Sequence, residues 1–123
     1  MKRKPTDAEL AILAILWKRG PSTVRDVTDA LGHETGYTTA LKLLQIMTEK
    51  GLVARDESAR THVYQAAVSA DETQRHLVSD LLKRAFNGSA AQLVLQALAA
   101  KKASPAELAA IRRMLNRHKA GTK

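Results

Sequence analysis

The spacing of apolar residues changes at Gly51, and this change restricts the fold more than any other feature of the chain. Before Gly51, apolar residues recur every three or four positions, which predicts helices over about 7–18, 23–31 and 37–50. After it the period falls to two, which predicts two short strands over 52–55 and 61–66. Three helices followed by a two-stranded hairpin is the element order of a winged helix-turn-helix.

Capping residues set the limits of the first two helices. Thr6 and Glu9 have the spacing of a capping box, in which each side chain bonds the backbone of the other. Gly20-Pro21 is expected to end the first helix and Gly32 the second. Ser22 is predicted to cap the second helix, which is therefore short.

Three further helices are predicted after the hairpin. They cover about 70–86, 90–100 and 105–118, with Ser69, Ser89 and Ser104 at their starts. Each has an apolar stripe, and a neighbour of 70 residues is too small to bury all three. We therefore expect a mainly α fold with a small β-hairpin. Residues 1–70 would form the winged helix-turn-helix DNA-binding domain, and residues 71–123 a helical dimerisation domain.

The charge of the chain suggests a polyanionic partner but does not locate its site. The formal net charge is +8. Residues 1–70 hold ten Lys and Arg against eight Asp and Glu, a net +2, whereas residues 71–123 hold ten against four, a net +6. The argument for DNA must therefore rest on local patterns. Aromatic residues make up only 3%, too few for a stacking platform that binds single strands.

Several classes of site are unlikely from composition alone, so we expect no catalytic residues, no metal and no cofactor. The chain has no cysteine, which excludes disulfides and thiolate ligands. Its serines at helix starts are expected to be caps and not nucleophiles. The histidines show no metal-ligand spacing; they are His33, His62, His76 and His118.

The amino terminus is basic, yet it does not resemble a signal peptide. Residues 10–17 have helical spacing and no small-residue cleavage site follows them. No apolar run approaches the roughly 20 residues that would cross a bilayer. We expect a cytoplasmic protein without membrane insertion.

The third predicted helix has an outward polar stripe that suits a DNA groove. The stripe consists of Thr38, Lys42, Gln45 and Glu49, and the inward stripe of Ala40, Leu43, Leu44 and Met47. Tyr37 and Thr39 flank the amino-terminal end. Threonine and lysine can both contact base edges, and the amino-terminal part of this helix meets the bases in helix-turn-helix proteins. A merely solvated surface is the other interpretation of such a stripe.

The sequence also resembles a known family, and the likeness extends in order over nearly the whole chain. Residues 36–45 and 49–53 are similar to the recognition-helix region of the penicillinase-repressor family. Residues 60–64, Arg-Thr-His-Val-Tyr, look like its wing strand, and 104–115 match its ending. The resemblance implies a homodimeric repressor that binds a palindromic operator.

The resemblance also implies functional residues. Tyr37, Thr38, Thr39 and Lys42 would face the DNA, and Arg60 on the wing would touch its backbone or minor groove. Gln45, Ser22 and His62 complete the predicted DNA-contacting set, with packing beside Tyr64 as the other role of His62. Ile46 stands where the family commonly has a basic residue, and the cysteine cluster of the copper-responsive members is absent.

In β-lactam-responsive members of the family, a membrane sensor-protease system triggers cleavage within the dimerisation tail. The matching bond here would join Gln96 and Ala97, where those members have Asn-Phe. A protease pocket fitted to a ring would lose most of its apolar contact with a methyl group.

Two other functions stay open from the sequence. The +6 tail would suit a helical interaction adaptor that binds an acidic protein. A ligand-sensing winged-helix repressor is the other, although the short tail leaves little room for a pocket of a few hundred cubic ångströms.

Overall fold

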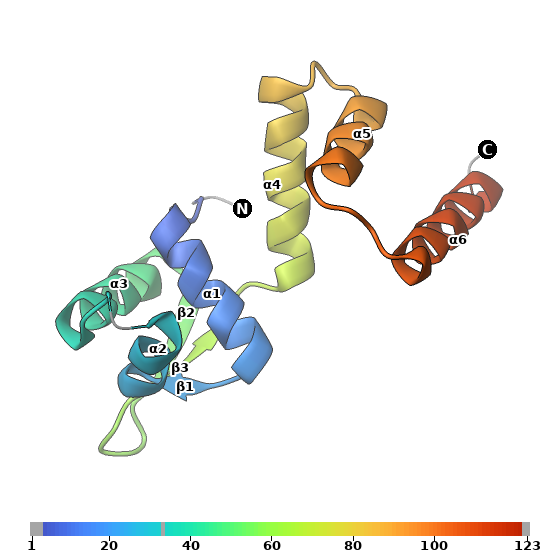
Figure 1. Cartoon of the computed structure of the whole chain (residues 1–123). Coiled ribbons are helices and arrows are strands. Elements are labelled where there is room, and N and C mark those ends of the chain that lie inside the picture. Colours follow the sequence, from blue (N-terminus) through green and yellow to red (C-terminus); the bar gives the residue numbers. More distant parts are fainter. Residues whose placement is uncertain (1–3, 33, 122–123) are drawn as a thin grey trace. The chain divides into compact units, whose positions relative to one another are not determined.

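A computed structural model of the chain describes residues 4–32 and 34–121 (Figure 1). His33, one of the histidines considered above, lies outside the described residues. The chain packs into two compact units, Met1–Val78 and Ser79–Lys123. The junction lies within a helix, eight residues beyond the division predicted at residue 70.

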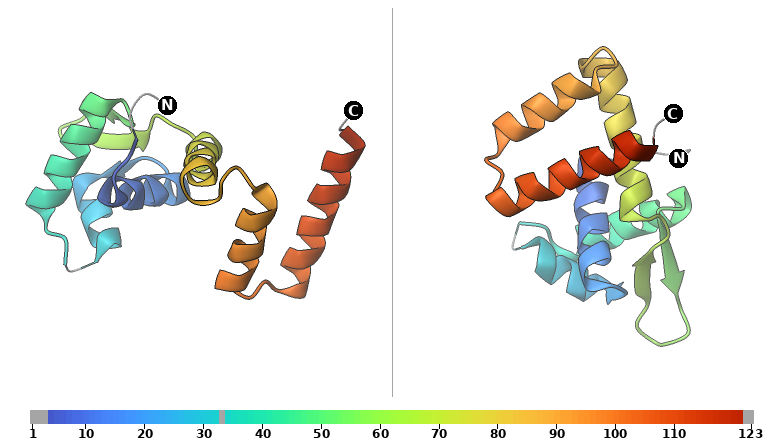
Figure 2. Two further views of the ribbon diagram at one scale, coloured as in Figure 1. Left: turned by 90° about the horizontal axis from the view of Figure 1, so that it is seen from above. Right: turned by 90° about the vertical axis from the view of Figure 1, so that its right-hand side faces the viewer.

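The amino-terminal unit contains the predicted order of three helices and a hairpin. Its elements are α1 (Asp7–Arg19), β1 (Ser22–Thr23), α2 (Val24–Leu31), α3 (Tyr37–Lys50), β2 (Val53–Asp56) and β3 (Val63–Ala66), followed by the start of α4 (Ala70–Ala85). Figure 2 shows the loop between β2 and β3 projecting from the sheet as a wing. The mainly helical winged-helix fold class is confirmed.

The sheet has one strand more than the sequence predicted. Its order is β1-β3-β2, with both pairs antiparallel. Ser22 lies opposite Tyr64, and Tyr64 lies opposite Arg55 on its other side. The two residues of β1 therefore attach the start of α2 to the base of the wing.

This short strand also corrects the predicted cap of α2. Ser22 does not cap the helix: its side chain is 2% exposed and its hydroxyl donates to the Gly20 carbonyl over 2.9 Å. Thr23 is the cap instead, because its Oγ1 accepts from the Asp26 amide at 3.1 Å while Asp26 accepts from the Thr23 amide at 3.0 Å. The capping box of Thr6 and Glu9 on α1 is confirmed.

One apolar core holds the amino-terminal unit together. It consists of Ile12, Leu13, Leu16, Val24, Val27, Ala40, Leu44, Met47, Leu52, Val53 and Tyr64. Leu43, predicted to point inward, is only partly buried at the edge of this core. Trp17 also packs against it, and its indole Nε1 donates to the Val68 carbonyl over 2.9 Å.

A buried ion pair joins the beginning of α1 to the end of α3. Lys50 Nζ lies 2.7 Å from Glu9 Oε1, and Glu9 is 2% exposed. Burial raises the pKa of Glu9, but hydrogen bonds from Lys50 and Thr6 outweigh burial, so the pKa lies below its ordinary value. The pair fixes the carboxyl-terminal end of α3 against α1.

The carboxyl-terminal unit consists of the rest of α4, α5 (Ala90–Ala100) and α6 (Pro105–Gly121). All three predicted tail helices are present. The hydroxyl groups of Ser69, Ser89 and Ser104 accept amide hydrogen bonds of 3.0, 3.1 and 3.1 Å at their starts. No described side chain from residue 74 to residue 118 is buried.

None of the helices, within the described residues, has the length and apolar character required to cross a membrane.

Candidate nucleic-acid interface

The outward face of α3 is a polar surface at the edge of the amino-terminal unit. Thr38, Thr39, Lys42 and Gln45 are all exposed, and Tyr37 is 49% exposed. The opposite face of the helix supplies Ala40, Leu44 and Met47 to the core. The predicted division of this helix into an inner and an outer face is therefore present, and the outer face is free of packing.

The two ends of α3 differ in how they are held. Gly36 occupies the amino-terminal cap position and makes no side-chain hydrogen bond to the helix. The first-turn amides thus keep their donors for an external acceptor. At the other end Gly51 adopts the left-handed conformation, with φ of 81°, and Lys50 is paired with Glu9. The anchored carboxyl-terminal end orients α3. The amino-terminal end, where the amides are free, is the end that contains Thr38 and Thr39.

The wing carries both cations and acids. Arg60 is exposed and His62 is half-buried. The Glu57 carboxylate lies 3.6 Å from His62 Nε2 and 3.5 Å from Arg55 Nη2. A hydrogen bond that the Arg55 guanidinium donates to Tyr64 and the charge of Glu57 raise the pKa of Arg55 above its ordinary value.

The tip of the wing is shaped by Asp56. Its Oδ1 accepts from the Ser58 amide over 2.9 Å, which turns the chain and lowers the pKa of the Asp56 carboxyl. The acidic groups of this loop are therefore engaged with the wing itself.

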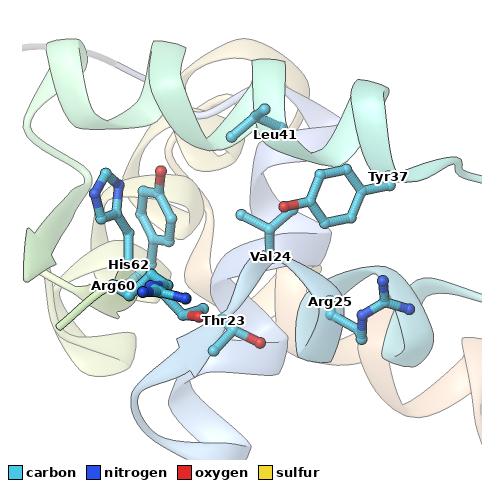
Figure 3. A pocket seen from close by; sticks show the side chains of 9 residues that line it. Thr23, Val24, Arg25, Tyr37, Leu41, Arg60 and His62 are labelled. Atoms are coloured by element: carbon cyan, nitrogen blue, oxygen red, sulfur yellow. The ribbon is translucent and has the colours of Figure 1, made fainter. Parts of the chain in front are cut away.

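A hollow of about 490 Å³ opens between α2, the start of α3 and the wing (Figure 3). Its lining consists of Thr23, Val24, Arg25, Tyr37, Leu41, Arg60, Thr61, His62 and Tyr64. In Figure 3, Arg60 and His62 lie to one side, Arg25 lies to the other, and the Tyr37 hydroxyl points between them.

The hollow gathers three of the predicted DNA-contacting residues, Tyr37, Arg60 and His62. Thr38, Thr39, Lys42 and Gln45 do not line it and lie along the exposed face of α3. Ser22 belongs to neither surface, since its side chain is buried and its hydroxyl is bonded to Gly20. The burial of Ser22 disfavours a DNA contact through its side chain, and the predicted role of this residue stays a prediction.

Sequence reasoning missed Arg25. A lone arginine on a short helix gives no signal of its own, and its place beside the wing depends on the pairing of β1 with β3.

The described residues contain no group of three or more His, Asp or Glu side chains that could hold a metal ion.

Gln96 and Ala97, the residues of the predicted cleavage bond, lie inside α5 with exposed side chains.

Comparison with known proteins identifies the family of the chain. A family model described as "Penicillinase repressor" matches residues 5–117. The chain belongs to the penicillinase repressor family. It is thus a DNA-binding transcriptional repressor and not an enzyme.

Two relatives illustrate the range of the penicillinase repressor family. The transcriptional regulator BlaI of Mycobacterium tuberculosis is 35% identical over 92 residues, which cover 72% of this chain and 67% of the relative. The penicillinase repressor of Bacillus licheniformis is 24% identical over 123 residues, covering 97% of this chain and 96% of the relative.

Solved structures support the winged-helix fold. The solution structure of the monomeric form of Bacillus licheniformis BlaI, in complex with the blaP half-operator, matches with a TM-score of 0.51 and 20% identity. The match covers 58% of this chain and 90% of that one.

Proposed function

We propose that this penicillinase repressor family member binds a palindromic operator in duplex DNA as a homodimer and thereby blocks transcription. The observation that carries the proposal is the exposed face at the amino-terminal end of α3, where Thr38, Thr39 and Lys42 point away from the core. This end has free amide donors, hydroxyl groups and a cation, the groups that read and hold a major groove. Since an operator in duplex DNA is reached inside the cell, the proposal implies a cytoplasmic location.

The residues of this surface divide between two tasks. Thr38, Thr39 and Lys42 would contact base edges, with Gln45 farther along the groove. Tyr37, Arg60 and His62 would contact the sugar–phosphate backbone, because they lie beside α3 and on the wing. The relative whose structure contains a half-operator supports one amino-terminal unit for each half-site.

Replacement of Thr39 by alanine tests the groove assignment. If Thr39 reads a base, Thr39→Ala should weaken binding to the operator by about 1–3 kcal/mol and binding to random DNA much less. Glu49→Ala, at the far end of the same exposed stripe, is the matched control and should keep the operator preference. Equal losses on both DNAs would limit Thr39 to the backbone, and no loss on either would reject α3 as the reading helix.

Residues 71–123 are proposed to hold the two chains together. Large apolar side chains remain exposed there, and pairing two tails would cover them; they include Leu81, Val94, Leu95, Leu98, Leu108, Met114 and Leu115. Two recognition helices would then meet half-sites roughly 34–36 Å apart. Sedimentation of the full chain should give a dimer at micromolar concentration, and a monomer there would reject the proposal.

Cleavage of the tail by a membrane sensor-protease system is the proposed route to derepression. A cut between Gln96 and Ala97 would divide α5 and separate the paired tails. Because the bond lies within a helix, the protease would have to unwind α5 locally before it could bind the chain in an extended form. Mass spectrometry after induction of the target genes should detect fragments 1–96 and 97–123. Full derepression with an intact chain would reject this route.

A further inference from the structure

We infer that the hollow between α2, α3 and the wing holds one phosphate of the DNA backbone, with Arg25 and Arg60 as its two cationic sides. The inference rests on the proposed function and adds Arg25, the hollow and a defined ligand to it. DNA-binding winged helices can contact phosphates at many surface points. The specific claim is that two arginines from different elements share a single phosphate.

The pairing of arginines in the amino-terminal unit singles out these two. Arg19 lies 3.7 Å from Asp26, Arg55 lies 3.5 Å from Glu57, and Arg75 lies 2.6 Å from Asp71. Within the described part of the chain, the structure gives neither Arg25 nor Arg60 an acidic partner, and both line the hollow. The unit therefore neutralises its other described arginines internally and leaves two guanidinium groups for an external anion.

The neighbouring acids do not occupy the hollow. No Asp or Glu is among its lining residues. The Asp26 carboxylate accepts from the Thr23 amide at 3.0 Å and serves the cap of α2. Glu57 is drawn towards Arg55 and His62 on the wing. The charge facing the space is thus positive, as an anion site requires.

The remaining lining fits a sugar–phosphate unit. Thr23, Thr61 and Tyr37 bring hydroxyl groups, and guanidinium groups bind phosphate oxygens in a fork geometry. Val24, Leu41 and Tyr64 add apolar area, against which a deoxyribose ring can rest. A space of about 490 Å³ lies within the 300–1,000 Å³ typical of small-molecule sites, so it exceeds the needs of a lone ion.

The position of the hollow favours backbone over bases. It opens at the start of α2 and α3 and at the wing, and neither Thr38 nor Lys42 is among its lining residues. In helix-turn-helix complexes the first helix of the motif crosses the backbone while the second enters the groove. Here α2 is that first helix, and Arg25 belongs to its first turn. The contact would fix the register of α3 without reading sequence.

The test measures whether Arg25 and Arg60 act on the same phosphate. The probe is a duplex that the full-length chain selects from random DNA, together with an unselected duplex of equal length. Arg25→Gln and Arg60→Gln should each weaken binding roughly tenfold on both duplexes, and the double variant should lose far less than the product of the two. The slope of log affinity against log salt should fall by about two in the double variant, about one for each half-site of the dimer. Arg75→Gln, which removes an arginine already paired with Asp71, is the charge-matched control and should have little effect.

Neutral methylphosphonate linkages then locate the contact. These linkages are introduced one at a time along the selected duplex. At one position in each half-site, the neutral linkage should abolish the loss of affinity caused by Arg25→Gln and that caused by Arg60→Gln. Separate positions for the two variants, or losses no greater than that of Arg75→Gln, would overturn the shared phosphate. Failure of the wild-type chain to select any duplex would instead reject the proposed function.

Free inorganic phosphate is the alternative ligand that would offer the hollow the same oxygen atoms and charge. The full chain is titrated with inorganic phosphate, and the amide NMR signals of Thr23 and Thr61 are monitored. These signals should show no saturable shift at millimolar phosphate. A saturable shift, combined with indifference to methylphosphonate linkages, would assign the hollow to a free anion and overturn the DNA contact.

Discussion

The amino-terminal unit buries its apolar side chains, whereas the carboxyl-terminal unit leaves its own in solvent. Within the described part of the chain, every buried apolar residue lies between Ile12 and Tyr64. From Ser79 onward, the described side chains include Leu95 at 56% exposure and Leu115 at 62%. Both units are built from well-capped helices, so helix formation does not distinguish them. The first unit contains its own packing partners, and the proposed dimer would supply those of the second.

This difference separates the two properties that a dimeric repressor needs. The core of the amino-terminal unit holds α3 and the wing in fixed positions, which determines what one half-site contacts. The exposed stripes of the carboxyl-terminal unit would determine whether two half-sites are bound together. The predictions below test whether mutations in one unit leave the property of the other unchanged.

A charge in the tail should have the largest effect on DNA binding. Leu95→Glu places a carboxylate on an apolar stripe of α5, where burial in a dimer would be costly. The chain should become monomeric, and operator affinity should fall by about 10²–10⁴, the advantage of a linked second half-site. Sedimentation and DNA-binding titrations measure the two effects. Gln92→Glu adds the same charge to the same helix and should preserve both; a dimeric Leu95→Glu protein would remove the tail from the interface.

A cavity in the core should show the converse behaviour. Leu44 is fully buried on the inner face of α3, and Leu44→Ala should lower the free energy of unfolding by about 2–5 kcal/mol. Denaturant titration measures this loss. The still-folded variant should keep the oligomeric state of the wild type, because the substitution lies outside the tail. Dissociation at denaturant concentrations where the amino-terminal unit remains folded would show that the units are not independent.

Loss of the Glu9–Lys50 pair should weaken the amino-terminal unit in a pH-dependent manner. Lys50→Met leaves a buried carboxylate without its cation and should cost about 2 kcal/mol at pH 7, less than a fully buried pair because the Lys50 side chain is 21% exposed. The folded wild-type chain holds the pKa of Glu9 below its ordinary 4.5. The stabilisation from Glu9 is therefore complete above pH 4.5 and is lost as the pH falls through the lower folded pKa.

The same substitution removes the hydrogen bond and the charge by which Lys50 lowers the pKa of Glu9, so this pKa should rise although the Thr6 hydrogen bonds remain. The stability difference between wild type and Lys50→Met should narrow as the medium is acidified, as measured by thermal unfolding at a series of pH values. Arg19→Met breaks an exposed pair with Asp26 and serves as the control, with a small effect at neutral pH. A constant difference across the pH range would contradict the assignment.

The smallest expected effect comes from removing a buried hydroxyl group in α4. Unlike the substitutions above, this change should increase stability. Thr73 is fully buried, and its Oγ1 has no hydrogen-bond partner among the described residues. Thr73→Val replaces the hydroxyl by a methyl of similar shape and should raise the free energy of unfolding by about 1 kcal/mol. Thr73→Ser keeps the hydroxyl and should not stabilise. A loss of stability in the valine variant would mean that the hydroxyl is satisfied in solution.

Local signals in the sequence were sufficient to predict the helices and the exposed surface of α3. Thr6 and Glu9 form the expected capping box, and Gly51 ends α3 in the left-handed conformation that glycine tolerates. The outer stripe of α3 follows from helical spacing, so Thr38, Lys42 and Gln45 are exposed as predicted. These features depend on residues within a few positions of one another.

Features that depend on distant pairing were not predictable in the same way. Ser22 and Thr23 are adjacent hydroxyl residues, and either could cap α2 from the sequence. Pairing with Tyr64 and Val63 takes residues 22–23 into the sheet, where Ser22 is buried and Thr23 is left to cap. The same pairing brings Arg25 and Arg60 to the lining of one hollow, and no spacing along the chain reveals that arrangement.

The single tryptophan gives the amino-terminal unit an optical signature of its own. Trp17 packs against the amino-terminal core, and its indole is hydrogen-bonded to Val68. Both tyrosines, Tyr37 and Tyr64, belong to the same unit, so Phe86 is the only aromatic residue from Ser79 onward. Fluorescence on heating therefore reports the amino-terminal unit alone, while far-ultraviolet circular dichroism reports helices in both. A fragment 97–123 has no Trp or Tyr and would not absorb at 280 nm. Chromatography of a cleaved sample must therefore be monitored at a wavelength where the peptide bond absorbs.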